Sequence, residues 1–234
     1  MRKLIGMLLD TETANTLDDP FVYDLAFAII DLYGHVLLKV RIIITDIFYG
    51  EADLMKSAYY AEKLPQYHEA IARGEVLTLN IWEARKFVRY ICEKYGVSFV
   101  AAHNARFDYK SLNTTLRYLS NGKVRHFMPY GIEWWDTQKM AHSTICKQKK
   151  YRRFCEENGY TYKCGKSVRM RETAEVIYRY ISKDNDFVEA HTALADVEIE
   201  AKILWKCFAQ HKKMNRKLFT KNLDKLPEMV LYYS

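Results

Sequence analysis

The feature that most constrains the fold is a nearly continuous apolar run at residues 4–9, which ends directly before an acidic pair. Such a run predicts a strand that is buried on both faces and therefore lies in the middle of a sheet. Asp10 and Glu12 follow it, two positions apart. Because side chains alternate along a strand, both carboxylates point to the same side and could share a cation.

After one predicted hairpin, the rest of the chain alternates strand and helix patterns. Residues 21–30 and 36–48 are rich in β-branched and aromatic residues, and the turn Tyr33-Gly34-His35 lies between them. Periodicity and capping residues predict short helices at 51–73, helices at 82–95, 104–121, 173–181 and 192–208, and strands at 98–102 and 131–135. This order is typical of an α/β fold whose sheet contains an antiparallel strand.

A second acidic segment lies where the strand at 98–102 is predicted to pass into a helix. It runs from His103 and Asn104 to Phe107 and Asp108. If Asn104 caps the helix, Asp108 lies about one turn inside it, near the strand ends where the sites of α/β proteins gather. An acidic residue near a helix N-terminus is also common for stability alone, so this segment by itself leaves both interpretations open.

A third segment places His191 and Asp196 around the start of the last predicted helix. Five helical residues correspond to about 500° of rotation, so the two side chains would point apart if both were helical. If Thr192 instead caps the helix, His191 lies on the preceding loop and Asp196 in the first turns. This placement suits a base beside a fixed metal ligand. A lone histidine is more often a surface or core residue, and only the neighbouring carboxylates favour catalysis.

Together, the three segments resemble the motifs of the DEDDh (DnaQ-like) 3′→5′ exonucleases. Asp10-Thr11-Glu12-Thr13 resembles the first motif, Asn104-Ala105-Arg106-Phe107-Asp108 the second, and His191-x-Ala193-x-x-Asp196 the third. The motifs occur in the family's order. The resemblance implies a ribonuclease-H-like fold, with a mixed five-stranded sheet that has one antiparallel strand and is flanked by helices.

The resemblance also implies a site and a reaction. In that family, two divalent cations are held by the residues that match Asp10, Glu12, Asp108 and Asp196, and the residue that matches His191 deprotonates the attacking water. Carboxylate ligands without cysteine independently favour Mg²⁺ or Mn²⁺ over Zn²⁺. The implied substrate-binding residues are Thr13, Ala14, Asn15, His103, Asn104 and Phe107. Asp136, which precedes a predicted helix, is expected to cap it and not to bind metal.

The implied reaction releases 5′-mononucleotides from single-stranded or frayed 3′ ends of DNA. RNA is also a candidate substrate, because no feature of the sequence indicates recognition of the 2′ position of the sugar. Two other functions are compatible with the same fold: a nucleic-acid-binding module with a dormant site, and an endonuclease of the wider ribonuclease-H-like group. The complete set of five site residues argues against the first, and the histidine motif argues against the second.

A basic segment at 147–171 offers a further candidate surface. It contains nine basic residues against Glu156 and Glu157, a surplus equal to the net charge of +7 for the whole chain. Because tyrosine and phenylalanine are interleaved, the segment could grip the phosphates and stack the bases of a single strand. Equally, it could be a soluble insertion whose aromatic side chains pack inward.

Composition and length set the remaining expectations. We expect one domain at 1–209, with the basic segment inside it, and a C-terminal tail at 210–234. The five cysteines include no C-x-x-C pair, which indicates reduced thiols and a cytoplasmic setting. No apolar run is long enough for a membrane span, so no membrane partner is expected. The expected partners are 3′ ends of single-stranded DNA or RNA. Because the family includes proofreading subunits, a polymerase or another replication or repair protein is a further candidate; the oligomeric state is left open.

Overall fold

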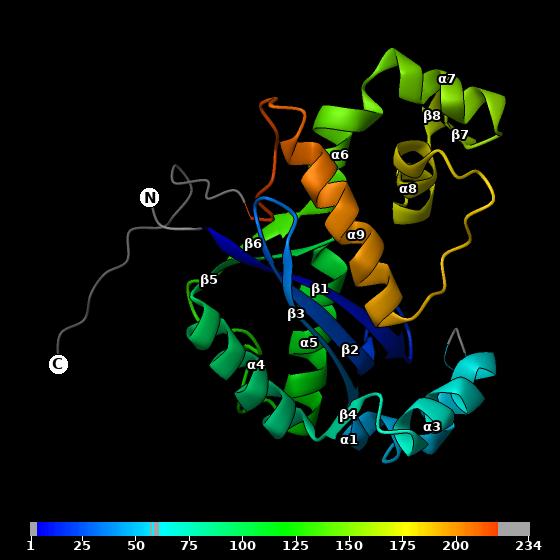
Figure 1. The fold of residues 1–234 in the computed structure, drawn as a ribbon. Coiled ribbons are helices and arrows are strands. Elements are labelled where there is room, and N and C mark those ends of the chain that lie inside the picture. Colours follow the sequence, from blue (N-terminus) through cyan, green and yellow to red (C-terminus); the bar gives the residue numbers. More distant parts are fainter. Residues whose placement is uncertain (1–3, 57, 59–60, 220–234) are drawn as a thin grey trace, which may run out of the picture.

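The computed structural model describes residues 4–56, 58 and 61–219, and a mixed sheet lies at its centre (Figure 1). Within these residues the sheet has six strands in the order β4-β3-β2-β1-β5-β6. They are β1 (Ile5–Ala14), β2 (Phe21–Asp31), β3 (Val36–Ile44), β4 (Leu77–Leu79), β5 (Val97–Ala102) and β6 (Glu133–Asp136). β2 pairs antiparallel with β1 and β3, while the other pairs are parallel. The predicted fold class is therefore confirmed, and the three-residue β4 adds an edge strand to the five that were expected.

β1 is buried on both faces, as its apolar run predicts. Met7 and Leu9 belong to the apolar cluster on one face of the sheet, whereas Leu8 belongs to the cluster on the other face. All three side chains are 0% exposed. The core is thus split by the sheet into two layers, and the strand that carries the first acidic pair is held between them.

Helices cover both faces of the sheet, with α4 and α5 on one side and α9 on the other (Figure 1). The helices before β5 are α1 (Thr45–Phe48), α2 (Ala52–Lys56), the 3-10 helix η1 (Ala61–Lys63), α3 (Leu64–Ala72) and α4 (Ile81–Tyr95). Those after β5 are α5 (Arg106–Leu119), α6 (Thr137–Ala141), the π-helix η2 (His142–Cys146), α7 (Lys149–Glu157), α8 (Ala174–Ser182) and α9 (Ala193–Phe208). A separate hairpin, β7 (Thr161–Cys164) with β8 (Ser167–Met170), follows α7.

Several helix boundaries follow from capping residues that the sequence shows. The Asn80 side chain accepts from the backbone N–H groups of Trp82 and Glu83 at the start of α4, and Gly96 ends that helix in the left-handed conformation. The Asp136 carboxylate accepts from the N–H groups of the first turn of α6, which confirms its expected role as a cap.

Two boundary predictions were wrong. Asn104 does not cap α5: it has a φ of 61°, and its carbonyl oxygen accepts from the Phe107 N–H in a turn before the helix. Asparagine tolerates this left-handed conformation, which explains the error. The strand predicted at 36–48 ends at Ile44, because residues 45–48 turn into α1, where the Asp46 carboxylate accepts from the Ile81 N–H at 2.6 Å.

The first part of the predicted tail pairs with the edge of the sheet. The Asp136 N–H donates to the Arg216 carbonyl at 2.8 Å, and the Leu218 N–H donates to the Trp134 carbonyl at 2.9 Å. This pairing covers the outer edge of β6, which would otherwise expose unpaired backbone groups. Residues 220–234 of the tail lie outside the described residues.

Among the described helices, none combines the length and the apolar character that crossing a bilayer requires.

Candidate metal centre

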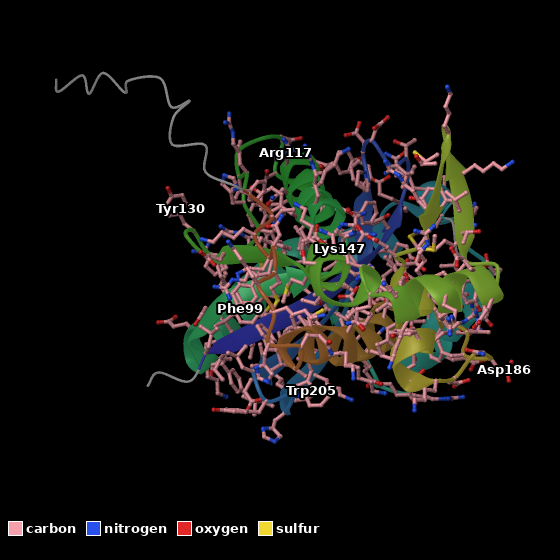
Figure 2. All side chains as sticks on the ribbon, turned by 90° about the horizontal axis from the view of Figure 1, so that it is seen from above. Phe99, Arg117, Tyr130, Lys147, Asp186 and Trp205 are labelled. Atoms are coloured by element: carbon pink, nitrogen blue, oxygen red, sulfur yellow. The ribbon has the colours of Figure 1, made fainter. Side chains whose placement is uncertain are left out.

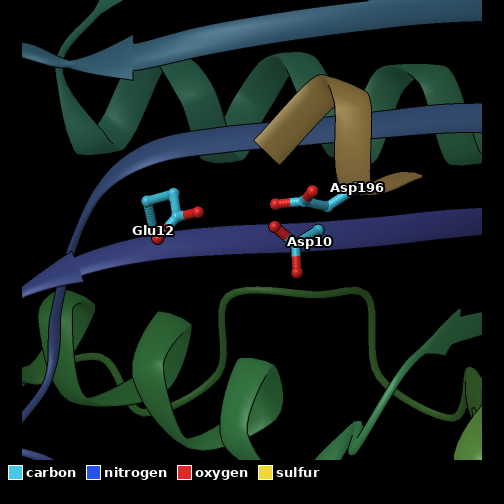
Figure 3. Close-up of side chains that lie close together, drawn as sticks. All are labelled: Asp10, Glu12 and Asp196. Carbon is cyan, nitrogen blue, oxygen red and sulfur yellow. The ribbon is translucent and has the colours of Figure 1, made fainter. Parts of the chain in front are cut away.

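Three acidic side chains from β1 and α9 meet at one end of the sheet. Ligand oxygens of Asp10, Glu12 and Asp196 all lie within 4.8 Å of one another. Figure 3 shows Asp196 reaching from α9 toward Asp10, with Glu12 further along the same strand. Segments that are more than 180 residues apart in the chain are thus brought together, as the acidic motifs predicted.

The local structure explains why these side chains converge. In β1, Asp10 is opposite Ala26 and Glu12 is opposite Asp24, so both belong to the regular part of the ladder and project to the same side. The register shifts immediately afterwards, between Glu12 and Thr13. Thr192 occupies the N-cap position of α9 without a side-chain hydrogen bond, and Asp196 therefore lies in the first turn of the helix.

Asp108 approaches the same region from the start of α5. Its carboxylate is 2% exposed and accepts a hydrogen bond of 2.9 Å from the Thr11 hydroxyl. Thr11 alternates with Asp10 and Glu12 along β1, so this contact is made on the opposite side of the strand. Burial raises the pKa of Asp10 most, and the charge of Asp108 is the second largest cause. Asp108 is therefore a neighbour of the three-carboxylate group, with its carboxylate turned toward Thr11.

Glu200 is a buried acidic residue that the sequence reasoning missed. It is 3% exposed, and its Oε2 accepts from the backbone N–H of His103 at 3.1 Å. Burial raises its pKa well above the ordinary value, and the charge of Asp108 raises it further. The sequence held a signal for it, because Glu200 follows Asp196 by four positions and lies on the same face of α9.

The electrostatics of the group favour a bound cation. Burial, and then the charge of Asp196, raises the pKa of Glu12 to about 9. Burial, and then the charge of Glu189, raises the pKa of Asp196 to about 8. One buried oxygen of Asp196, Oδ1, has no hydrogen-bond donor among the described residues. Like charges packed this closely and a buried acceptor without a donor are conditions that a divalent cation would relieve.

Another buried carboxylate close by is already neutralised. Asp24, which lies opposite Glu12 on β2, is 0% exposed. Both of its oxygens accept from the Arg41 guanidinium, at 2.8 to 3.1 Å. A carboxylate held in this fork by a cationic side chain has little need of a metal ion. Asp24 therefore differs from the group formed by Asp10, Glu12 and Asp196.

His191 lies on the loop before α9, as the predicted cap position implies. Its backbone has a φ of 49°, and its side chain is 38% exposed. The Nδ1 atom lies 3.8 Å from a carboxylate oxygen of Glu189. Burial, and then the charge of Lys63, lowers the pKa of His191 below its ordinary value of 6.5. The imidazole is therefore largely neutral at pH 7, which is the form that can accept a proton.

Lys63 positions this histidine loop. Its Nζ donates to the carbonyl oxygens of Ala190 at 2.5 Å and of His191 at 3.2 Å. No sequence signal identified Lys63, because it comes from the η1 helix in a stretch that matches no motif. The contact joins this helical segment to the loop that carries the candidate base.

The predicted substrate-binding residues differ in burial and in the hydrogen bonds that they already make. Thr13 and Ala14 end β1, and Ala14 is completely buried, so its expected contact with the substrate stays a prediction. Asn15 has a φ of 69° and donates from Nδ2 to the Asp19 carbonyl at 2.8 Å. Phe107 is half-buried, and Asn104 is exposed.

His103 is half-buried, and its ring contacts other protein groups. Its Nδ1 lies 3.1 Å from the Thr137 hydroxyl, and its Nε2 lies 2.8 Å from the Glu172 carbonyl oxygen. The structure therefore occupies both ring nitrogens with protein partners, and the expected role of His103 in substrate binding stays a prediction.

Comparisons with known proteins place the fold. No family model matches the chain, and no curated protein matches it. A solved structure described as a full-length 3′-exonuclease aligns with a TM-score of 0.62 and 9% identity, over 94% of this chain and 88% of that one. A second, described as a 3′-exonuclease that recognises the 3′ end of a histone mRNA stem-loop, aligns with a TM-score of 0.58 and 10% identity, over 93% of this chain and 68% of that one. At these identities the likeness concerns the fold, which this chain shares with two 3′-exonucleases.

Proposed function

We propose that this chain is a metal-dependent 3′→5′ exonuclease of the DEDDh type. The observation that carries the proposal is the buried group of Asp10, Glu12 and Asp196, whose oxygens converge and include a buried acceptor without a donor. Its location on a fold shared with two 3′-exonucleases supports the same reaction class. The fold alone would not support a particular reaction, because one fold can host many activities.

The donor set fits two divalent cations of the Mg²⁺ or Mn²⁺ type. Asp10, Glu12 and Asp196 would hold them, and Asp108 is the proposed fourth ligand. When bound, such cations supply positive charge at the reacting phosphate and lower the pKa of water. They would also neutralise the mutual repulsion that raises the pKa values of these carboxylates.

His191 is the proposed general base. Its lowered pKa keeps the ring neutral at pH 7, and it accepts a proton from the attacking water. The water oxygen bonds to the phosphorus of the terminal phosphodiester, and the bond to the 3′ oxygen of the preceding nucleotide breaks. That oxygen leaves and takes up a proton from solvent. The products are a 5′-mononucleotide and a strand that is one nucleotide shorter.

The direct test is degradation of a 5′-labelled oligonucleotide. We expect stepwise shortening with Mg²⁺ or Mn²⁺, none with a chelator, and none for Asp10→Ala. Asp53→Ala is the matched control, because Asp53 lies on the surface helix α2 and its side chain is 97% exposed. Single- and double-stranded DNA and RNA, run in parallel, identify the preferred substrate. Internal cleavage would contradict the exonuclease assignment, and binding without cleavage would indicate a dormant binding module.

A further inference from the structure

A large cavity lies outside the acidic centre, under the basic segment. Its volume is about 1150 Å³, and it is lined by α6, the π-helix η2, α7 and the hairpin formed by β7 and β8. This exceeds the 300–1,000 Å³ that is usual for small-molecule pockets. Figure 2 views the molecule from the end at which α7 lies and labels Lys147 on that side. The size of the cavity suits an extended ligand.

The lining of the cavity is strongly positive. It includes five basic side chains and one carboxylate, namely Lys147, Lys149, Arg152, Arg169, Arg171 and Glu172. All five basic residues are exposed. Arg152 pairs with Glu156, at 2.9 Å, whereas the other four form no ion pair within the described part of the chain. A concentration of unpaired cations in a hollow attracts a polyanion and raises its local concentration.

The cavity wall is connected to the acidic centre through His103 and Glu200. The Glu172 carbonyl oxygen, in the wall, accepts from the Gln138 side chain at 3.2 Å and lies 2.8 Å from the His103 ring. The backbone N–H of the same His103 donates to Glu200, which is buried beside the acidic group. This chain of hydrogen bonds places the cavity wall close to the acidic centre.

The aromatic residues of the basic segment have a different role from its cations. Tyr151 is completely buried and makes an edge-to-face contact with Tyr180, and Phe154 packs between Tyr160 and Tyr180. These side chains pack inward, as the insertion hypothesis held. Tyr162 is 45% exposed and lines the cavity, where it offers one ring for stacking. Phosphate contacts, more than base stacking, would therefore dominate binding here.

We propose that this basic cavity holds the phosphates of a single strand on the 5′ side of its terminal nucleotide. The inference rests on the proposed function, because an exonuclease that removes the 3′ nucleotide leaves the rest of the strand on the 5′ side. That remainder is a polyanion which must pass beside the acidic centre, and the cavity next to His103 supplies the cations to hold it.

The test compares two triple variants with equal loss of charge. The cavity variant combines Lys149→Gln, Arg169→Gln and Arg171→Gln. The control combines Lys86→Gln, Lys94→Gln and Lys123→Gln, which are exposed residues of α4 and of the loop after α5. All six side chains lie on the surface, so both variants should fold, and the thermal midpoint verifies this.

The first measurement is kcat/KM on a dinucleotide and on a single strand of about 12 nucleotides, a length within the range of single-strand binding sites. We expect the ratio of the longer to the shorter substrate to fall at least about tenfold in the cavity variant, which corresponds to about 1.4 kcal/mol. The control should keep the wild-type ratio. An equal ratio in all three proteins would overturn the proposal.

The second measurement does not depend on catalysis. Binding of a fluorescent single strand is followed in the presence of a chelator while the salt concentration is varied. Each lost phosphate contact lowers the slope of log K against log salt by about 0.7, so the cavity variant should lose about 2. Equal slopes for the cavity variant and the control, or no binding by the wild type, would overturn the inference. Normal slopes without cleavage by the wild type would instead refute the exonuclease and leave the binding site standing.

Discussion

Asp196→Asn is expected to stabilise the metal-free protein while it removes metal binding. The substitution keeps the shape of the side chain and removes its charge. In the folded protein the pKa of Asp196 is raised from 3.8 to about 8 by burial and by the charge of Glu189. The folded state therefore holds a proton at pH 7 that the unfolded state releases, so the carboxyl group favours unfolding.

The magnitude follows from proton linkage. Between the ordinary pKa of 3.8 and pH 7, each unit is worth about 1.4 kcal/mol, which gives a cost to folding of about 4 kcal/mol. Asparagine avoids this cost, but its amide protons require acceptors, and an unsatisfied buried donor costs about 1–3 kcal/mol. The nearby oxygens of Asp10 and Glu12 can accept from only part of the amide, so some of this penalty stays. A net stabilisation of about 2 kcal/mol remains, which is about 4–8 °C in Tm for a chain of this size.

Thermal unfolding at pH 7 with a chelator, and again with saturating Mn²⁺, tests this reasoning. The wild type should gain about 2.7 kcal/mol when the metal is at a hundred times its Kd, whereas Asp196→Asn should gain much less. The difference in thermal midpoint between Asp196→Asn and the wild type therefore becomes smaller or changes sign when metal is added. Asp53→Asn, an exposed control, should change the midpoint by less than about 2 °C in either condition. A lower metal-free midpoint for Asp196→Asn, or an equal response of both proteins to Mn²⁺, would refute the electrostatic account.

Three further predictions use the same preparations. His191→Ala should lower kcat by about 10²-fold or more, without changing the Tm shift that Mn²⁺ produces; an equal loss of both would contradict its role as base. Glu200→Leu should be about 1–3 kcal/mol less stable than Glu200→Gln without metal, because both variants lose the carboxyl group but only leucine leaves the His103 N–H without an acceptor; chemical denaturation distinguishes them. In the folded protein the pKa values of Glu12 and Asp196 are raised to about 9 and about 8. The folded state therefore binds more protons than the unfolded state, and the free energy of unfolding of the metal-free protein should fall as the pH rises from about 4 toward 9. A metal-free Tm that is constant from pH 5 to 9, measured by circular dichroism, would contradict this sign.

Local patterns in the sequence determined the framework of the protein. The apolar run before Asp10 predicted the central strand, because a strand buried on both faces needs apolar side chains at every position. The two-residue spacing of Asp10 and Glu12, and the predicted cap at Thr192, anticipated that the carboxylates of Asp10, Glu12 and Asp196 lie close together, since both inferences depend on the short-range geometry of the backbone.

The long-range contacts of the site could not be predicted, because they join segments that no sequence periodicity relates. The contact of Asp108 with Thr11, the acceptor role of Glu200 and the hold of Lys63 on the histidine loop each span roughly 100 residues or more. The division of the basic segment into inward aromatic rings and outward cations likewise depends on which neighbours pack against it. A sequence specifies which groups are able to ionise, but their burial and the distances between them set their pKa values, and both arise only when the chain folds.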